Sequence, residues 1–556
     1  MTELNRRTFL AATAATAAST AIAGRASALG IEATGASTGP YFRHGVASGD
    51  PLPTRVILWT RVTPSADLAP GIGSGPSVSV RWQIAKNRAF DRVVDSGAFT
   101  TGAARDYTVK VDADGLQPDT SYYYRFVFNG TPSRIGRTRT APDQSASPHN
   151  LRFGVVSCSN LQAGYFSPYR HLAGRDDLDA IVHLGDYLYE YGPGRYGYGN
   201  SNTDIRSHVP AHEMVSLCDY RQRHAQYKQD PDLQRLHAKL PFIATWDDHE
   251  SANDAYRRGA ENHQPDTEGD WQPRKWRAHR AYDEWMPTRM SDTASLGDGD
   301  RLYRSLRFGT LANLSMLDLR SYRSKQVEQS ELSEVNDPDR SITGDPQMVW
   351  LKDQLITPQV QWKIVGNPVM IAPVVFPPLP NELTAALNDV TGLLPPDGVP
   401  YNVDQWDGYT ADRHEIFGHI SDHGLQNTVF LTGDIHSAWA CDLPRNAGTY
   451  PASKTVGTEF VCTSVTSNNL DDITNSPPRT TSIAVEEGIK ANNRHVKYLN
   501  FDDHGYSVVD ITSARLQMDY YKISDRADRN ATTEWTQSWA TAADTQRVHR
   551  VEGPVA

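Results

Sequence analysis

The stretch Asp179-Ala-Ile-Val-His-Leu-Gly-Asp186-Tyr-Leu-Tyr189-Glu190 joins an apolar run of strand character to a glycine and then a carboxylate. Three further stretches share this layout, and each closes on side chains that can bind a metal: Leu151-Arg-Phe-Gly-Val-Val-Ser-Cys158, Pro241-Phe-Ile-Ala-Thr-Trp246-Asp247-Asp248-His249-Glu250 and Thr428-Val-Phe-Leu-Thr-Gly-Asp434-Ile-His436. Polar residues at the carboxyl ends of neighbouring strands in an open α/β sheet meet in one crevice. The sequence therefore predicts a site at strand ends, whose ligand types favour a metal centre over a Ser-His-Asp triad.

Composition places the chain among ordinary globular proteins. It has 556 residues, 38% hydrophobic and 22% charged, which suggests about two or three domains. The net charge of −11, from 55 basic and 66 acidic residues, argues against a nucleic-acid partner, because binding to a phosphate backbone needs a basic surface. Phosphorylated substrates stay possible, because bound cations reverse the local field.

Residues 1–28 have the features of a twin-arginine export signal. Arg6-Arg7-Thr8-Phe9-Leu10 precedes a weakly apolar stretch, and Ala26-Ser27-Ala28 has the form of a cleavage site. A disordered tail is the alternative. We expect export of the folded protein by the twin-arginine translocase and a secreted location, and no later run is apolar for long enough to span a bilayer.

Two regions follow the signal. Residues 41–142 contain short alternating strands and the stretch Leu116-Gln-Pro-Asp-Thr-Ser-Tyr122, which resembles the tyrosine corner of immunoglobulin-like and fibronectin-like β-sandwiches. Residues 150–556 alternate strand-like and helix-like segments, as α/β domains do. A Pro-rich apolar segment, Pro368 to Gly408, is either a lid or a segment that packs over the core. Cys441 and Cys462 are the pair we expect if a disulfide forms.

Asp186 is the expected centre of the site, because one carboxylate can bridge two cations about 3.5–4 Å apart. Tyr189 is a candidate phenolate ligand for a highly charged ion such as ferric iron. Cys158 would join the same cluster as a thiolate. Taken singly, these residues also fit a turn, a core tyrosine and an inert buried thiol. Their combination favours the metal centre.

The other strand ends supply further candidates. Consecutive side chains cannot all bind one ion, so we expect Asp248 to be a ligand and His249 to act in proton transfer or to orient a ligand. Asp434 and His436 lie two residues apart in extended chain and face the same side. Asn367 offers a neutral oxygen suited to calcium, although a turn role fits it as well.

The order of these motifs resembles the PhoD-type alkaline phosphatases and phosphodiesterases from about Tyr41 onward. The matching motifs are His44-Gly-Val-Ala-Ser-Gly-Asp-Pro51, Cys158, Gly185 to Glu190, Trp246 to Glu250, Tyr282 to Arg289, Leu317 to Arg323, Trp406 to Tyr409 and Gly433 to His436. The resemblance implies a calcineurin-like metallophosphoesterase core of two packed sheets flanked by helices, placed after the sandwich. It also implies Fe³⁺ held by Cys158, Asp186 and Tyr189, with Ca²⁺ nearby. Departures from the superfamily pattern, including Asp248, Asn367 and Asp434, favour oxygen ligands over imidazole.

The resemblance further implies the chemistry. Metals would activate a water for in-line attack on phosphorus, and Arg320 or Arg323 would clamp phosphoryl oxygens. His249 would protonate the leaving alkoxide or orient the water. The export signal and the apolar segment fit the secreted actinobacterial members that act as calcium-dependent phospholipase D, with a peripheral contact to a membrane or micelle surface. A broad alkaline phosphatase acting on monoesters is the alternative. A cell-surface binding protein with structural metals is a remote one.

Overall fold

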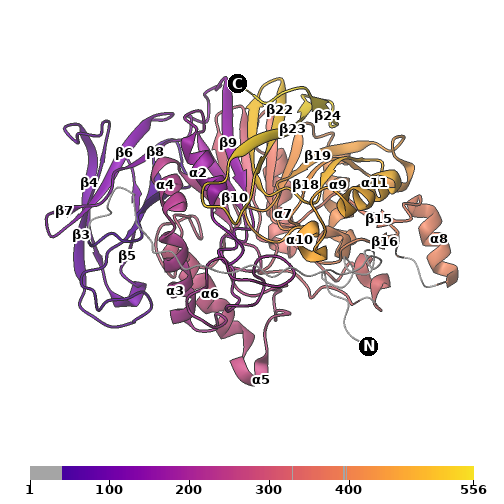
Figure 1. Ribbon diagram of the computed structural model, residues 1–556. Helices are drawn as coiled ribbons and strands as arrows, with labels where there is room; N and C mark the ends of the chain where they lie inside the picture. Colours follow the sequence, from indigo (N-terminus) through magenta and orange to yellow (C-terminus); the bar gives the residue numbers. More distant parts are fainter. Residues whose placement is uncertain (1–39, 329, 392–394, 396, 556) are drawn as a thin grey trace.

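The computed structural model describes residues 40–328, 330–391, 395 and 397–555, and the predicted export signal 1–28 lies outside these ranges. Two large β-sheets lie face to face in the centre of the molecule, and helices cover their outer faces (Figure 1). One sheet has ten strands and the other has seven. This arrangement of two packed sheets flanked by helices confirms the predicted α/β fold class.

The ten-stranded sheet contains three of the strands expected to carry ligands. Its central strands β9 (Asn150–Val156), β10 (Ala180–Leu184) and β11 (Phe242–Thr245) are neighbours and run parallel, with Val182 opposite both Val155 and Ile243. Their carboxyl ends therefore lie side by side. The sheet continues on one side through β21 (Gly505–Thr512), β22 (Arg515–Ile523), β23 (Thr533–Ala542) and β24 (Val548–Val551).

The seven-stranded sheet supplies the remaining strand ends. Its order is β12 (Arg304–Phe308), β13 (Ala312–Met316), β14 (Trp362–Asn367), β17 (Thr428–Thr432), β19 (Thr455–Val461), β18 (Ala438–Pro444) and β20 (Val496–Asn500). Strands β13, β14, β17 and β19 are parallel neighbours. The ends of β14 and β17 therefore carry Asn367 and Asp434 to the same edge of the molecule.

The core lies in three layers between sheets and helices. Buried side chains such as Val182, Leu314 and Leu431 fill the space between the two sheets. The outer face of the ten-stranded sheet packs against α2 (Ser167–Gly174), α3 (Leu217–Lys228), α4 (Pro231–Lys239) and α6 (Trp271–Trp285). The outer face of the seven-stranded sheet packs against α7 (Asp345–Ile356), α9 (Thr410–Asp422) and α11 (Thr481–Asn492). Within the described ranges, no helix has both the length and the hydropathy needed to cross a bilayer.

The N-terminal region is a sandwich that shares a sheet with the rest of the chain. Strands β3 (Val78–Ala85), β4 (Val93–Thr101), β6 (Ser121–Phe128), β7 (Thr131–Pro132) and β8 (Gly136–Arg139) form its outer sheet. Its inner strands, β1 (Val46–Gly49), β2 (Val56–Arg61) and β5 (Thr108–Ala113), extend the ten-stranded sheet, because β1 pairs with β11. The expected tyrosine corner is present, since the Tyr122 hydroxyl accepts a hydrogen bond from the Gln117 N–H at 2.8 Å. The sandwich is thus continuous with the larger domain.

The Pro-rich segment Pro368 to Gly408 has two parts. Val369, Ile371 and Val374 are buried in the core beneath the seven-stranded sheet. The middle of the segment forms β15 (Val375–Phe376), α8 (Asn381–Thr391) and β16 (Val399–Pro400), and α8 lies at the edge of the molecule (Figure 1). The segment therefore both packs on the core and projects a helix outward.

Cys441 and Cys462, the pair expected if a disulfide forms, are not bonded to each other. Both thiols are free and buried. Cys441 pairs with Glu459 across β18 and β19, and Cys462 lies three residues beyond Glu459, an odd offset that points it to the opposite face. Accordingly, Cys441 packs under the helices and Cys462 packs between the sheets.

Candidate metal centre

Asp186 is the common member of the acidic groups at the strand ends. Three sets of side chains each place their ligand atoms within 4.8 Å of one another: Cys158, Asp186 and His436; Asp186, Asp248 and His249; and Asp186, Asp247, Asp248 and Asp434. Asp186 is 1% exposed, and its Oδ1 accepts no hydrogen bond. A buried, unpartnered carboxylate oxygen within a ring of other ligand atoms is suited to a cation.

Cys158, Tyr189 and His436 gather on one side of Asp186. The Tyr189 hydroxyl lies 2.9 Å from Asp186 Oδ2 and 3.4 Å from His436 Nε2. The Ser467 hydroxyl, which has one hydrogen to donate, lies 2.6 Å from the Tyr189 oxygen and 3.0 Å from the Cys158 carbonyl oxygen. Burial and the charge of Asp186 raise the pKa of both the Cys158 thiol and the Tyr189 phenol. Only a strong cation would therefore hold these groups as thiolate and phenolate.

The carboxylates Asp247, Asp248 and Asp434 gather on the other side. Gly185 allows their approach, because a Cβ at this position (φ +105°) would lie 2.5 Å from the Asp247 Cβ. Burial, with added repulsion from Asp248 and Asp247, raises the pKa of Asp186 well above its ordinary value, although His249 opposes the shift. The cluster is therefore under electrostatic strain that bound cations would relieve.

Four of the proposed ligands adopt left-handed backbone conformations. The φ values are 60° at Cys158, 54° at Asp186, 67° at Asp434 and 54° at His436. Such conformations are uncommon for residues other than glycine and cost about 1–3 kcal/mol each. The four residues follow the ends of β9, β10 and β17, where the chain leaves each sheet. Such clusters of strained residues are typical of functional sites.

His249 is fixed by a buried acidic partner. Its Nδ1 lies 2.7 Å from Glu190 Oε2, and Glu190 Oε1 accepts hydrogen bonds from the Asn253 N–H and the Asn262 amide, each at 2.8 Å. Burial alone would lower the pKa of His249, but the charges of Asp248, Glu190 and Asp186 outweigh it and raise the pKa well above 6.5. Glu190 thus holds His249 in one orientation beside the cluster.

Arg320 and Arg323 are paired with buried acidic groups, and their assignment as a phosphoryl clamp stays a prediction. Arg320 binds Asp247 through Nε and Nη2, at 2.5 and 2.9 Å, and also binds Asp404 through Nη1 at 2.9 Å. Arg323 binds the Asp404 side chain and the Asp404 and Ala255 carbonyls. Both guanidinium groups are buried counter-charges, because carboxylates and carbonyls accept hydrogen bonds from most of their N–H groups.

Asn367 is engaged by protein groups. Its amide nitrogen donates to the Val369 carbonyl and the Thr432 hydroxyl, and its oxygen accepts from the Trp406 indole at 3.1 Å. These bonds connect β14, β17 and the end of the Pro-rich segment. Its assignment as a calcium ligand stays a prediction.

Several residues of the site had no clear signal in the sequence. Asp404 lies within the Pro-rich segment and Ser467 lies far from the strand-end motifs, so long-range contacts bring both to the centre. Asp247 and Glu190 directly adjoin Asp248 and Tyr189 in those motifs, which is the signal that could have identified them.

The comparisons with known proteins agree with this geometry. The PhoD-like phosphatase profile matches residues 153–520, and the profile of the PhoD-like phosphatase N-terminal domain matches residues 26–142. The chain belongs to the PhoD-like phosphatase family. It is 34% identical to alkaline phosphatase D of Bacillus subtilis (strain 168) over 485 residues, which is 86% of this chain and 77% of that protein. A solved structure described as the structure of PhoD is 33% identical, covers 94% of both chains and superposes with a TM-score of 0.81.

Membership of the PhoD-like family implies metal ions, and the residues present fit them. The unpartnered Asp186 Oδ1 and the surplus of buried carboxylates need positive charge. The side of the cluster that contains Cys158, Tyr189 and His436 suits a transition metal. The side that contains the other carboxylates suits a hard cation. This PhoD-like chain is therefore a phosphoric ester hydrolase with a candidate site for more than one metal.

Proposed function

We propose that this protein is a phosphodiesterase of phospholipase D type, which releases the head-group alcohol from glycerophospholipids. The observation that carries the proposal is the pairing of the two arginines beside the cluster. Arg320 and Arg323 are committed to Asp247 and Asp404. A phosphomonoester dianion has one more anionic oxygen than a diester and gains from an uncommitted cation, so a site that pairs its arginines favours the diester.

The side chains divide the proposed reaction among themselves. Bound cations would neutralise the phosphoryl oxygens and make a water nucleophilic near neutral pH. The protonated imidazole of His249 gives its proton to the departing alkoxide oxygen. Glu190 holds the imidazole in position through Nδ1, and Asp186 fixes the relative positions of the ligands around it. No protein nucleophile is needed.

Iron and calcium are the metals we propose. Thiolate and phenolate from Cys158 and Tyr189, together with Asp186 and His436, form a donor set for Fe³⁺. Asp248 and Asp434 supply carboxylate oxygens for Ca²⁺. The grouping of these side chains supports this division.

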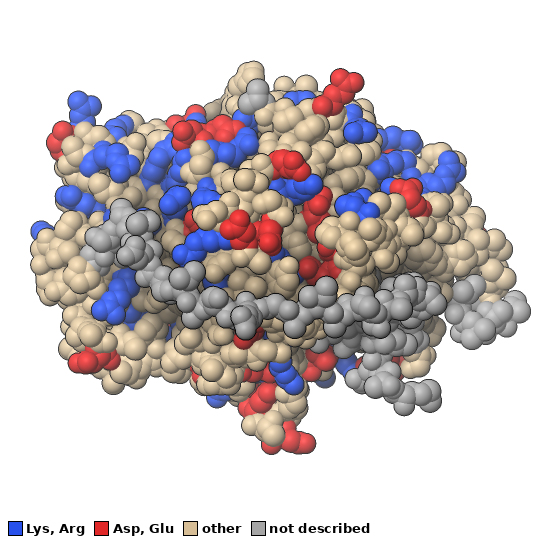
Figure 2. Space-filling view, viewed as in Figure 1, with Lys and Arg blue, Asp and Glu red and all other residues tan. Residues whose placement is uncertain are grey.

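Secretion and contact with a lipid surface complete the proposal. The twin-arginine signal of residues 1–28 supports export by the twin-arginine translocase. Helix α8 carries Leu383, which is 47% exposed at the edge of the molecule. An exposed leucine on a peripheral helix supports a shallow contact with micelles or membranes. Basic and acidic side chains are mixed over the face in Figure 2, so we expect no strong preference for anionic surfaces there.

The test compares two activities of the purified protein with calcium and iron. We expect release of head-group alcohol from phospholipid micelles to exceed phosphate release from an aryl monoester in kcat/KM. The reverse order would overturn the proposal and favour alkaline phosphatase activity, the second candidate. The similarity to alkaline phosphatase D supports that second candidate. Bound metal without either activity would favour the binding-protein alternative.

A further inference from the structure

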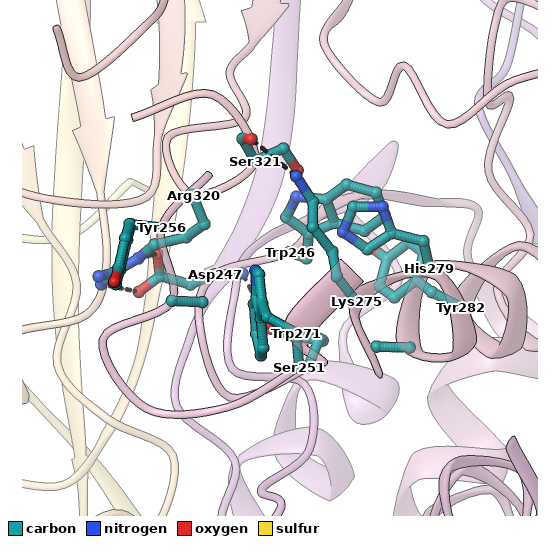
Figure 3. A pocket seen from close by; sticks show the side chains of 13 residues that line it. Trp246, Asp247, Ser251, Tyr256, Trp271, Lys275, His279, Tyr282, Arg320 and Ser321 are labelled. Atoms are coloured by element: carbon teal, nitrogen blue, oxygen red, sulfur yellow. Dashed lines mark hydrogen bonds and ion pairs between the residues drawn. The ribbon is translucent and has the colours of Figure 1, made fainter. Parts of the chain in front are cut away.

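A cavity opens beside the metal centre, on the side of helix α6. It is small and open to solvent on one side, and its lining includes Asp247 and Arg320. The opposite wall comes from Trp246, Trp271, Lys275 and Tyr282 (Figure 3). Because Asp247 also belongs to the acidic metal group, the cavity adjoins the place where an ester phosphate would bind.

Four hydrogen-bond donors in the wall have no partner. These atoms are the indole nitrogens of Trp246 and Trp271 and the hydroxyls of Tyr282 and Ser321. Their residues range from 0% exposed for Tyr282 to 6% for Trp271. Indole N–H groups can only donate, and buried polar groups are almost always hydrogen-bonded. The wall therefore holds four buried polar groups that lack a hydrogen-bond partner.

Lys275 adds a positive charge to this wall. Its ammonium donates one recorded hydrogen bond, to the Ser321 carbonyl at 2.7 Å, and an ammonium has three N–H groups. The carboxylates that also line the cavity are engaged elsewhere. Asp247 is bound to Arg320, and Glu250 accepts hydrogen bonds from the backbone N–H groups of Asp186, Tyr187 and Asp247. The donors and the ammonium together suit an anion.

We propose that this cavity is a subsite for a negatively charged substituent, such as a carboxylate, on the alcohol arm of the substrate. The inference rests on the proposed function and deepens it by naming the class of head group. An anionic arm would bind Lys275 and the indole N–H groups while its phosphate lies at the metal cluster. A quaternary ammonium arm would meet the Lys275 charge and unpaired donors, and would bind poorly.

Two pairs of substrates isolate this substituent, because serine differs from ethanolamine by one carboxylate. The first pair is glycerophosphoserine and glycerophosphoethanolamine, followed through release of glycerol phosphate. The second pair is O-phosphoserine and phosphoethanolamine, followed through release of phosphate. We expect the wild type to favour the serine ester about tenfold in kcat/KM, as one charge-assisted interaction allows. Equal values, or preference for ethanolamine, would overturn the proposal.

Substitutions test the assignment to Lys275. K275M should raise KM for the serine ester about tenfold more than for the ethanolamine ester, whereas K275R should restore most of the preference. W271F, which keeps a ring and removes the N–H, should reduce the preference severalfold. The control is W276F, because Trp276 lies on the same helix and is 60% exposed. A K275M enzyme with the full serine preference would refute the subsite.

The two substrate pairs separate this inference from the proposed function. If neither diester is hydrolysed and both monoesters are, the phosphodiesterase proposal fails, and the monoester pair still decides whether the subsite exists. If both diesters are hydrolysed at equal rates by wild type and K275M, the function stands and the subsite fails. The preference of the wild-type enzyme for the serine ester can be measured without any variant. This measurement therefore decides whether the subsite exists even if K275M does not fold.

Discussion

Glu190 Oε2 lies 2.7 Å from His249 Nδ1, and both side chains are buried beside Asp186. The pair connects the ends of two adjacent strands of the ten-stranded sheet, because Glu190 follows β10 and His249 follows β11. The contact fixes which ring nitrogen of His249 faces the carboxylate and leaves Nε2 for proton transfer. Orientation of the proton donor is therefore a property of the fold.

Replacing Glu190 tests this orientation. E190Q keeps the size of the side chain but removes the charge that holds the imidazolium, so we expect kcat to fall about 10–100-fold. Initial rates at saturating substrate measure the effect. H249N and the double variant E190Q/H249N complete a double-mutant cycle. The second substitution should lower kcat only slightly once the first is present. Fully additive losses would show that the two residues act independently.

Asp186 should be indispensable for metal binding. D186N preserves shape and removes the shared charge of all three ligand groups, so we expect loss of bound metal together with loss of turnover. Elemental analysis of the purified variant measures the metal independently of activity. A D186N protein that keeps its full metal content would contradict the central place given to this residue.

Tyr189 should give the protein a colour when iron is bound. A phenolate ligand to ferric iron produces a visible absorption band, so Y189F should lose that band while keeping the fold. The control is S467A, which removes the hydroxyl beside the Tyr189 oxygen and the Cys158 carbonyl and should shift the band without abolishing it. An unchanged spectrum in Y189F would exclude Tyr189 as a ligand.

Asp397 should anchor the end of the Pro-rich segment in a pH-dependent way. Burial would raise its pKa, but the hydrogen bond to His414 and the charge of Arg413 outweigh this and lower it from 3.8 to about 2. A carboxyl group whose pKa is lowered by folding stabilises the protein at pH values above the pKa of the unfolded chain. This contribution is lost as the pH falls from about 4 to about 2. D397N should therefore lower the free energy of unfolding by about 2 kcal/mol at pH 7, measured by urea titration. The deficit should be much smaller at pH 2, and an equal deficit at both values would contradict this role.

Leu383 on α8 tests the contact with lipid surfaces. L383D places a charge on the peripheral helix, and we expect kcat/KM to fall severalfold for micellar substrate and to stay within twofold for a soluble ester. I483D is the matched control, because Ile483 is 42% exposed on α11. Equal losses on both substrates would remove α8 from the lipid contact.

The sequence alone determined the residues that stand at the strand ends. Apolar segments that end just before Cys158, Asp186, Asp248 and Asp434 were sufficient to predict the strands and the edge of the molecule at which these side chains meet. Burial and strand periodicity are local properties of the sequence. The tyrosine corner could also be predicted, because Leu116 and Tyr122 lie close together in the sequence, in one turn and the strand that follows it. Adjacent strand ends then bring the ligands together without further information.

Only the tertiary structure decided how those residues are used. Arg320 meets Asp404 across 84 residues of sequence, and Ser467 meets Tyr189 across 278. Such contacts depend on the packing of separate loops, which no local pattern encodes. The same reason explains why Cys441 and Cys462 are not bonded to each other, because the face of a sheet to which each thiol points depends on strand register. It also explains why the N-terminal sandwich joins the larger sheet: the pairing of β1 with β11 connects segments almost 200 residues apart, and no local sequence signal marks it.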